Sequence, residues 1–118
     1  MVIERKHTGP RMSQIVIHNK TVYLAGQVAA NAPGKSITEQ AKDVLATIDA
    51  LLAEAKSDKS RILSATIWLT DMALFAEMNN VWDSWVVSGA TPARATVVSG
   101  QLASPDFDIE IAVIAAQA

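Results

Sequence analysis

The sequence predicts an α+β fold in which two helices pack on one face of a mixed β-sheet. Two segments have the three-and-four spacing of a one-sided helix, and six shorter segments are rich in β-branched and aromatic residues. The helices follow groups of strands rather than alternating with every strand, which favours a mixed sheet. The resulting order is β-β-β-α-β-α-β-β. With 118 residues, the chain is long enough for a single domain over residues 1–118 and too short for two.

Six segments have the composition of strands. We expect them at residues 2–6, 14–18, 21–28, 62–70, 94–99 and 108–115. Asn19 and Lys20 separate the second segment from the third. Because Asn tolerates the left-handed backbone that primed turns need, this pair predicts a tight hairpin.

The first helix is expected to begin near Ser36, which forms an S-x-x-E capping box with Glu39. The second is expected to begin at Asp71 as its N-cap and to stop at Gly89. Each helix has one apolar stripe. In the first helix it consists of Ile37, Ala41, Val44, Leu45, Ile48, Leu51, Leu52 and Ala55. In the second helix it consists of Leu74, Phe75, Met78, Val81, Trp82, Trp85 and Val86. A one-sided helix needs a surface to cover, and the strands supply it.

The last strand segment is apolar on both sides apart from Glu110. Large exposed apolar patches are unusual on small monomers, so this pattern indicates that another subunit covers the second face of the sheet. The alternative is a central strand covered by a loop of the same chain.

Composition excludes several classes of function. The net charge is −2 and no basic run appears, which argues against nucleic acid as a partner. The chain has no cysteine, which excludes disulfides, thiolate chemistry and Cys-ligated zinc. No segment at the start is apolar enough for a signal peptide or a membrane span, so we expect a cytoplasmic protein. Phosphate loops, dinucleotide fingerprints, paired-His metal spacings and nucleophile elbows are missing. His7 and His18 lie in polar, turn-like surroundings typical of solvated side chains.

Two charged residues stand out in otherwise apolar strands. Arg94 follows Pro92 and lies between Ala93 and Ala95, where it is either an edge residue reaching solvent or a guanidinium at the floor of a pocket. In a pocket, its planar fork suits a bidentate carboxylate. Glu110 either faces solvent at a strand margin or pairs with Arg94, and a salt bridge without chemistry is the structural alternative.

The chain has three tryptophans, a high count for its length. Trp82 and Trp85 are at helical spacing. This favours core or subunit-interface anchors over a stacking platform.

The segment Pro92-Ala93-Arg94, followed by residues 108–115, resembles the C-terminal signature of the reactive intermediate deaminases, the Rid or YjgF proteins. Residues 21–27, 40–51 and 64–71 also fit this family in order, and residues 78–86 resemble its YoaB-like branch. The resemblance implies a chorismate-mutase-like fold and a homotrimer with ligand sites in the clefts between subunits. It implies hydrolysis of reactive enamines and imines to 2-oxo acids and ammonia, with no metal or organic cofactor.

Carried over onto this sequence, the resemblance assigns Arg94 to the substrate carboxylate and Glu110 to the attacking water. Backbone groups around Gly26 and Thr96 would line the same cleft. A fixed guanidinium can orient a small 2-imino acid while a carboxylate accepts a proton from water.

This sequence departs from the deaminase pattern at three places. Met12 or Arg11 stands where the deaminases have a tyrosine, Ala25 replaces a serine and Thr96 replaces a cysteine. The site thus keeps its charge anchor and loses part of its polar lining. Two hypotheses follow: an imine or enamine hydrolase, and a non-catalytic trimer that binds small carboxylates such as 2-oxo acids. Hydrolysis of another acyl or amide-like bond, as in some relatives, stays open.

Overall fold

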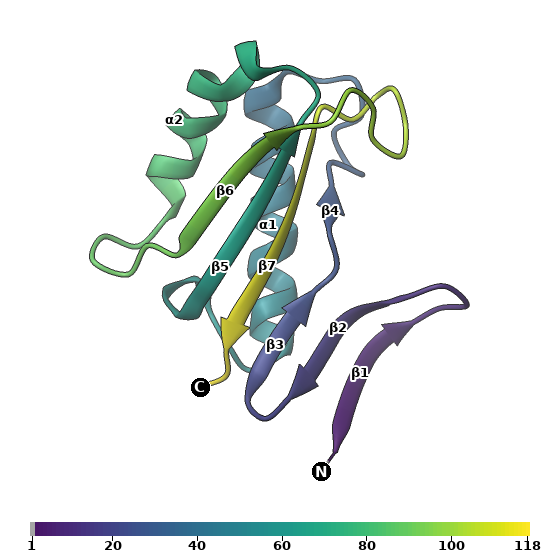
Figure 1. The fold of residues 1–118 in the computed structure, drawn as a ribbon, viewed down its shortest axis with the longest axis vertical. Helices are drawn as coiled ribbons and strands as arrows, with labels where there is room; N and C mark the ends of the chain where they lie inside the picture. Colours follow the sequence, from purple (N-terminus) through teal and green to yellow (C-terminus); the bar gives the residue numbers. More distant parts are fainter. Residues whose placement is uncertain (1) are drawn as a thin grey trace.

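The computed structural model describes residues 2–118 and has two layers, a twisted sheet and a pair of helices packed against one of its faces (Figure 1). The strands are β1 (Ile3–Thr8), β2 (Ser13–His18), β3 (Thr21–Leu24), β4 (Gln27–Val28), β5 (Ile62–Leu69), β6 (Ala93–Val98) and β7 (Ile109–Ala116). The helices are α1 (Ile37–Glu54) and α2 (Phe75–Trp85), with short 3₁₀ turns η1 (Lys59–Arg61) and η2 (Met72–Leu74).

The sheet is mixed, as the sequence predicts. Its strand order is β1-β2-β3-β7-β5-β6, with β4 paired to β7 beyond the end of β3. Strands β5 and β6 run parallel, and the remaining pairs are antiparallel. The α+β class with both helices on one face is therefore confirmed, and β6 lies at one edge of the sheet.

The hairpin between β2 and β3 is confirmed. His18 pairs with Thr21 across a two-residue turn in which Asn19 has φ 50° and Lys20 has φ 62°. Two consecutive left-handed residues match the right-handed twist of the flanking strands.

The third predicted strand, residues 21–28, is wrong as a single strand. β3 ends at Leu24 and β4 begins at Gln27, and Ala25 donates its N–H to the carbonyl of Gln14, 3.0 Å away. Gly26 lies at the break. A Cβ at this position would be 2.9 Å from Cδ of Glu110, so a glycine is needed where that side chain occupies the space.

Helix α1 begins as expected, because Oγ of Ser36 accepts a hydrogen bond of 3.1 Å from the N–H of Glu39. The predicted start of the second helix at Asp71 is wrong, because Asp71 caps the turn η2, where its carboxylate accepts the N–H of Ala73 at 2.8 Å, and α2 begins only at Phe75. The turn η2 leads directly into α2.

The predicted stop of the second helix at Gly89 is wrong. Helix α2 ends at Trp85, because the next residue, Val86, takes an extended conformation with φ −64° and ψ 154°. Gly89 instead lies in the next turn with φ 81°, which a glycine adopts without strain.

The hydrophobic core lies between the helices and the sheet. Alternate residues of β7 point into it and are almost fully buried, namely Ile109, Ile111, Val113 and Ala115. From the helices, Val44 and Ile48 of α1 and Met78 of α2 complete the same cluster. Burial of these side chains is the main stabilising contribution to the fold.

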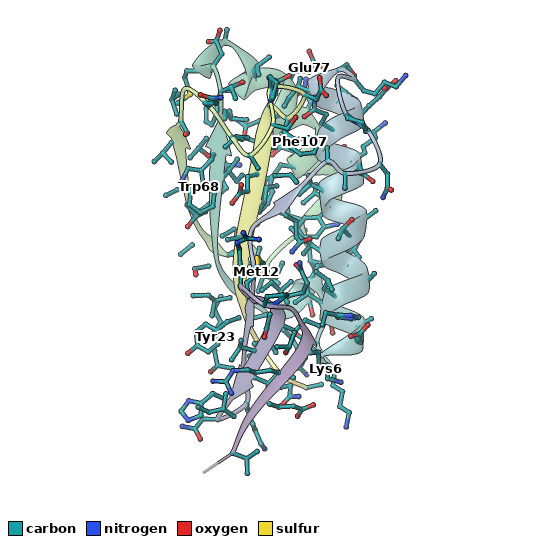
Figure 2. The ribbon with its side chains drawn as sticks, turned by 90° about the vertical axis from the view of Figure 1, so that its right-hand side faces the viewer. Lys6, Met12, Tyr23, Trp68, Glu77 and Phe107 are labelled. Carbon is teal, nitrogen blue, oxygen red and sulfur yellow. The ribbon has the colours of Figure 1, made fainter. Side chains whose placement is uncertain are left out.

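Over the opposite side of the sheet, here called the open face, the described residues place no helix. Tyr23 and Trp68 project from this side, away from α1 (Figure 2). Tyr23 is 43% exposed and Val97 is 42% exposed, and β7 contributes Ala112 and Ile114. β7 is a central strand, yet its second side belongs to a broad, partly exposed apolar surface.

Gln40 joins α1 to the loop that precedes β7. Its side chain is fully buried, accepts the N–H of Asp108 at 2.8 Å and donates to the carbonyl of Lys35 at 2.9 Å. Gln40→Ala should lower the free energy of unfolding by about 2 kcal/mol, because it leaves buried backbone groups without partners. Urea denaturation would measure this, with the exposed Gln101→Ala as the matched control. Equal stability of the two variants would contradict the anchoring role.

Candidate functional site

Arg94 lies on the edge strand β6, on the side of the sheet that faces the helices. Its in-register neighbour on β5 is the buried Ala65. Nη1 of Arg94 donates a hydrogen bond of 2.9 Å to Oδ1 of Asn79 on α2. The guanidinium carbon is 5.3 Å from the ring centroid of Trp82 and 5.7 Å from that of Phe75. The guanidinium is thus held under α2 by an amide and two aromatic rings.

Within residues 2–118, no carboxylate forms an ion pair with the guanidinium of Arg94. The ion pairs within residues 2–118 join Lys6 to Glu4, His7 to Glu54 and Arg61 to Asp58, and none includes Arg94. The remaining N–H groups of the guanidinium are therefore available to an anion. Of the two alternatives open from sequence, a solvated edge residue or a held guanidinium, the structure favours the second.

A small hollow lies on the open face of the sheet, over the segments of β5 and β6 that include the backbone of Arg94. Its volume is about 250 Å³, and it is lined by Ser64, Ala65, Thr66, Ala93, Arg94 and Ala95. The lining is formed by β5 and β6 at the sheet edge. Such a hollow is too open to enclose a ligand within one chain.

Glu110 lies on β7 and projects from the open face. Its in-register neighbours are Trp68 on β5 and Val28 on β4, and its carboxylate fills the space above Gly26. Glu110 and Arg94 are on strands separated by β5 and point to opposite faces of the sheet. A salt bridge between them within one chain, the structural alternative, is therefore wrong.

The other predicted site residues fall beside one or the other of these two charges. Thr96 is two residues from Arg94 on the same face, and its Oγ1 is buried with no hydrogen-bond partner in the described part of the chain. Ala25 and Gly26 form the kink next to Glu110. Arg94 with Thr96 is called the Arg94 half-site below, and Glu110 with Ala25 and Gly26 is called the Glu110 half-site.

Within one chain, Met12 belongs to neither half-site. It lies in the turn between β1 and β2, where its carbonyl accepts the N–H of Gly9 at 2.8 Å, and it is 49% exposed. A methionine there offers an apolar, flexible surface in place of a phenol.

Sequence reasoning missed Asn79 as a site residue and treated Phe75 and Trp82 only as parts of an apolar stripe. The sequence spacing of these three residues could have indicated the role of Asn79. Phe75, Asn79 and Trp82 are four and three residues apart, which places them on one side of a helix. A polar residue within an apolar stripe indicates a buried partner, and here the partner is Arg94. Trp82 is a core residue, 6% exposed, and also stacks on the guanidinium.

Comparison with known proteins places this arrangement in a family. The family model described as Endoribonuclease L-PSP matches residues 5–117. The chain belongs to this family, the Rid or YjgF proteins. A crystal structure of a YjgF family member from Neisseria meningitidis is 46% identical, covers 100% of this chain and 97% of its own, and superposes with a TM-score of 0.95.

Curated Rid/YjgF relatives extend over the same length. A RutC family protein of Haemophilus influenzae is 44% identical over 98% of this chain and 98% of its own. The RutC family protein YoaB of Escherichia coli K12 is 46% identical over 98% of this chain and 99% of its own. The expected family and its YoaB-like branch are confirmed, and with them the chorismate-mutase-like form of the α+β fold.

Two kinds of feature are absent from the described residues of this Rid/YjgF protein. Within residues 2–118, no helix is both long and apolar enough to cross a membrane. Nor do the described residues place three or more histidine, cysteine or acidic side chains together as metal ligands.

Proposed function

We propose that this Rid/YjgF protein hydrolyses reactive 2-imino and 2-enamino acids to 2-oxo acids and ammonia. The observation that carries the proposal is that the Arg94 side chain is held in place and its charge is left unpaired within the described residues. Its guanidinium is fixed by Asn79 and Trp82 and forms no ion pair within residues 2–118. A fixed, unneutralised guanidinium is a receptor for a small carboxylate, and 2-imino acids carry one.

The proposed site lies between subunits of a homotrimer. One chain cannot bring Arg94 and Glu110 to the same small molecule, because the two side chains leave opposite faces of its sheet. Arg94 is on the edge strand β6, from which it can meet the Glu110 half-site of a neighbouring copy. Assembly through the open face would bury the apolar side chains that a single chain leaves exposed.

In this site, Arg94 of one subunit orients the substrate carboxylate and Glu110 of the neighbour positions a water molecule. The water oxygen bonds to the imine carbon, Glu110 takes a proton from it, and the C=N electron pair moves to nitrogen. The C–N bond then breaks as the C=O bond forms. Both protons of the water end on the departing ammonia, the first relayed by Glu110. An enamine enters the same path after tautomerising to the imine.

The direct test measures release of ammonia and 2-oxo acid from imines that an amino-acid oxidase generates in the assay. We expect the protein to accelerate hydrolysis over buffer for several amino acids. Rates equal to buffer across all of them would contradict the enzymatic proposal. Sedimentation equilibrium of the same sample should give the mass of three chains, and a monomer would contradict the composite site.

A second candidate is a non-catalytic trimer that binds 2-oxo acids. It is favoured by Met12, Ala25 and Thr96, which stand where the deaminases have polar or thiol side chains. Titration calorimetry with 2-oxobutyrate separates the two candidates. Binding that requires Arg94, without turnover of any imine, would favour the second.

The description of the matching family model names an endoribonuclease, so RNA is a third substrate to test. This chain has a net charge of −2 and no basic run to neutralise a row of phosphates. We therefore expect labelled single-stranded RNA to stay intact under the conditions of the imine assay. Specific cleavage that Arg94→Ala abolishes would contradict this expectation.

Asn79→Ala should weaken binding of 2-oxobutyrate about fivefold, because the guanidinium loses the hydrogen bond to Asn79 that orients it. The adjacent Asn80→Ala is the matched control, since Asn80 is exposed and makes no bond to Arg94. Calorimetry on both variants measures the difference. Equal affinities would show that the aromatic rings alone hold Arg94.

A further inference from the structure

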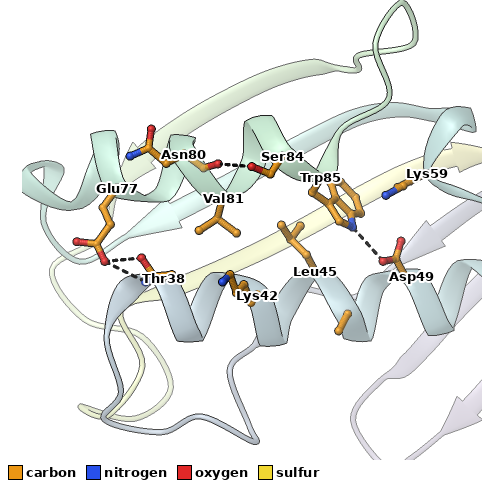
Figure 3. A pocket seen from close by; sticks show the side chains of 11 residues that line it. Thr38, Lys42, Leu45, Asp49, Lys59, Glu77, Asn80, Val81, Ser84 and Trp85 are labelled. Carbon is orange, nitrogen blue, oxygen red and sulfur yellow. Dashed lines mark hydrogen bonds between the residues drawn. The ribbon is translucent and has the colours of Figure 1, made fainter.

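A groove runs between α1 and α2 on the solvent side of the helix layer (Figure 3). Its volume is about 480 Å³, which is within the usual range for small-molecule sites. None of its lining residues belongs to the Arg94 or Glu110 half-sites. We propose that this groove is a second ligand site, which takes a small amphipathic organic anion with a flat apolar body and one carboxylate.

Hydrogen bonds between the two helices close the groove at both ends. At one end, Glu77 of α2 accepts the hydroxyl of Thr38 of α1 at 2.6 Å and its N–H at 3.2 Å. At the other end, Nε1–H of Trp85 donates to Asp49 at 3.0 Å. Both acids of the groove are therefore engaged by donors of the protein itself.

The lysines of the groove are not engaged in the same way. Neither Lys42 nor Lys59 takes part in an ion pair within the described residues. Lys59 holds its Nζ 5.5 Å from the ring centroid of Trp85, in a cation–π contact. The formal charges of the groove balance, but its carboxylates already accept hydrogen bonds and its ammonium groups are free to donate them. An entering ligand meets available cations.

The floor of the groove is apolar. Leu45 of α1 and Val81 of α2 are buried beneath it, and the ring of Trp85 forms one wall (Figure 3). A flat hydrocarbon body can displace water from this floor, while its carboxylate stays at the mouth within reach of a lysine. The combination selects against neutral apolar molecules and against small anions that have no apolar body.

The test is a titration of the ¹⁵N-labelled protein with 2-naphthoate, followed by NMR. The indole N–H resonance of Trp85, assigned by comparison with Trp85→Phe, should shift saturably. The double variant Lys42→Gln/Lys59→Gln should raise Kd at least about fivefold, because two charge contacts are lost. Lys20→Gln, in the hairpin between β2 and β3, is the matched control and should bind as the wild type does.

Three results would overturn the proposal. The first is the absence of a saturable shift of the Trp85 indole resonance. The second is a Kd for 2-naphthoate that is unchanged in the double variant, when its spectrum shows that it is folded. The third is that the wild type binds the uncharged 2-naphthylmethanol as tightly as 2-naphthoate. Arg94→Ala should bind 2-naphthoate normally at Trp85. This separates the groove from the proposed imine site, so that failure of either one leaves the other standing.

Discussion

Arg94→Ala should weaken binding of 2-oxobutyrate about a hundredfold and reduce imine hydrolysis at least as much. Removing one partner of a desolvated, hydrogen-bonded charge pair costs about 2–5 kcal/mol, and a hundredfold loss of affinity, about 2.7 kcal/mol, lies near the lower end of that range. Arg94 is held by Asn79 and two aromatic rings before any ligand arrives, so little ordering of the guanidinium opposes binding. Calorimetry and the coupled oxidase assay measure the two quantities.

The controls for this variant address charge and folding separately. Arg94→Lys keeps the charge but not the planar fork, and should retain only part of the affinity. Arg5→Ala, at an exposed position of β1, should change neither affinity nor turnover. Thermal melts of Arg94→Ala show whether loss of the stacking on Trp82 has unfolded the protein. A folded Arg94→Ala protein with wild-type affinity would refute the role assigned to Arg94.

Glu110→Gln should reduce imine hydrolysis about a hundredfold or more while leaving the affinity for 2-oxobutyrate within a small factor of the wild type. The amide has the same shape as the carboxylate and fits the space above Gly26, but it does not accept a proton from water. Rates of imine hydrolysis and the Kd for 2-oxobutyrate, measured on the same preparations of variant and wild type, test this expectation.

Glu39→Gln, an exposed carboxylate on α1, is the matched control and should hydrolyse imines at the wild-type rate. Loss of binding together with turnover in Glu110→Gln would indicate that Glu110 shapes the site instead of acting on water. Full turnover would remove Glu110 from the mechanism. Together with Arg94→Ala, this variant separates anchoring of the carboxylate from the chemical step.

Local signals predicted much of this fold because they act over a few residues. The capping contact of Ser36 with Glu39, the left-handed turn at Asn19 and Lys20 and the alternation along β7 all depend on neighbours in sequence. Three predictions about the bounds of elements were wrong, and each concerns a place where the local pattern does not decide the backbone. The predicted third strand breaks at Gly26, where Glu110 of β7 occupies the space of a Cβ. Asp71 caps the turn η2 that precedes α2, and α2 ends where Val86 becomes extended.

The sequence by itself determined the fold class, the family and the two charged residues that the proposed chemistry uses. These depend on residue type and order, and on the small number of ways in which one-sided helices can cover a sheet. Only the tertiary structure showed that Arg94 and Glu110 leave opposite faces of the sheet, and that Asn79 holds the arginine. The physical reason is that strand order and register set which face and which neighbour each side chain meets, and these are decided by pairing between segments far apart in the chain.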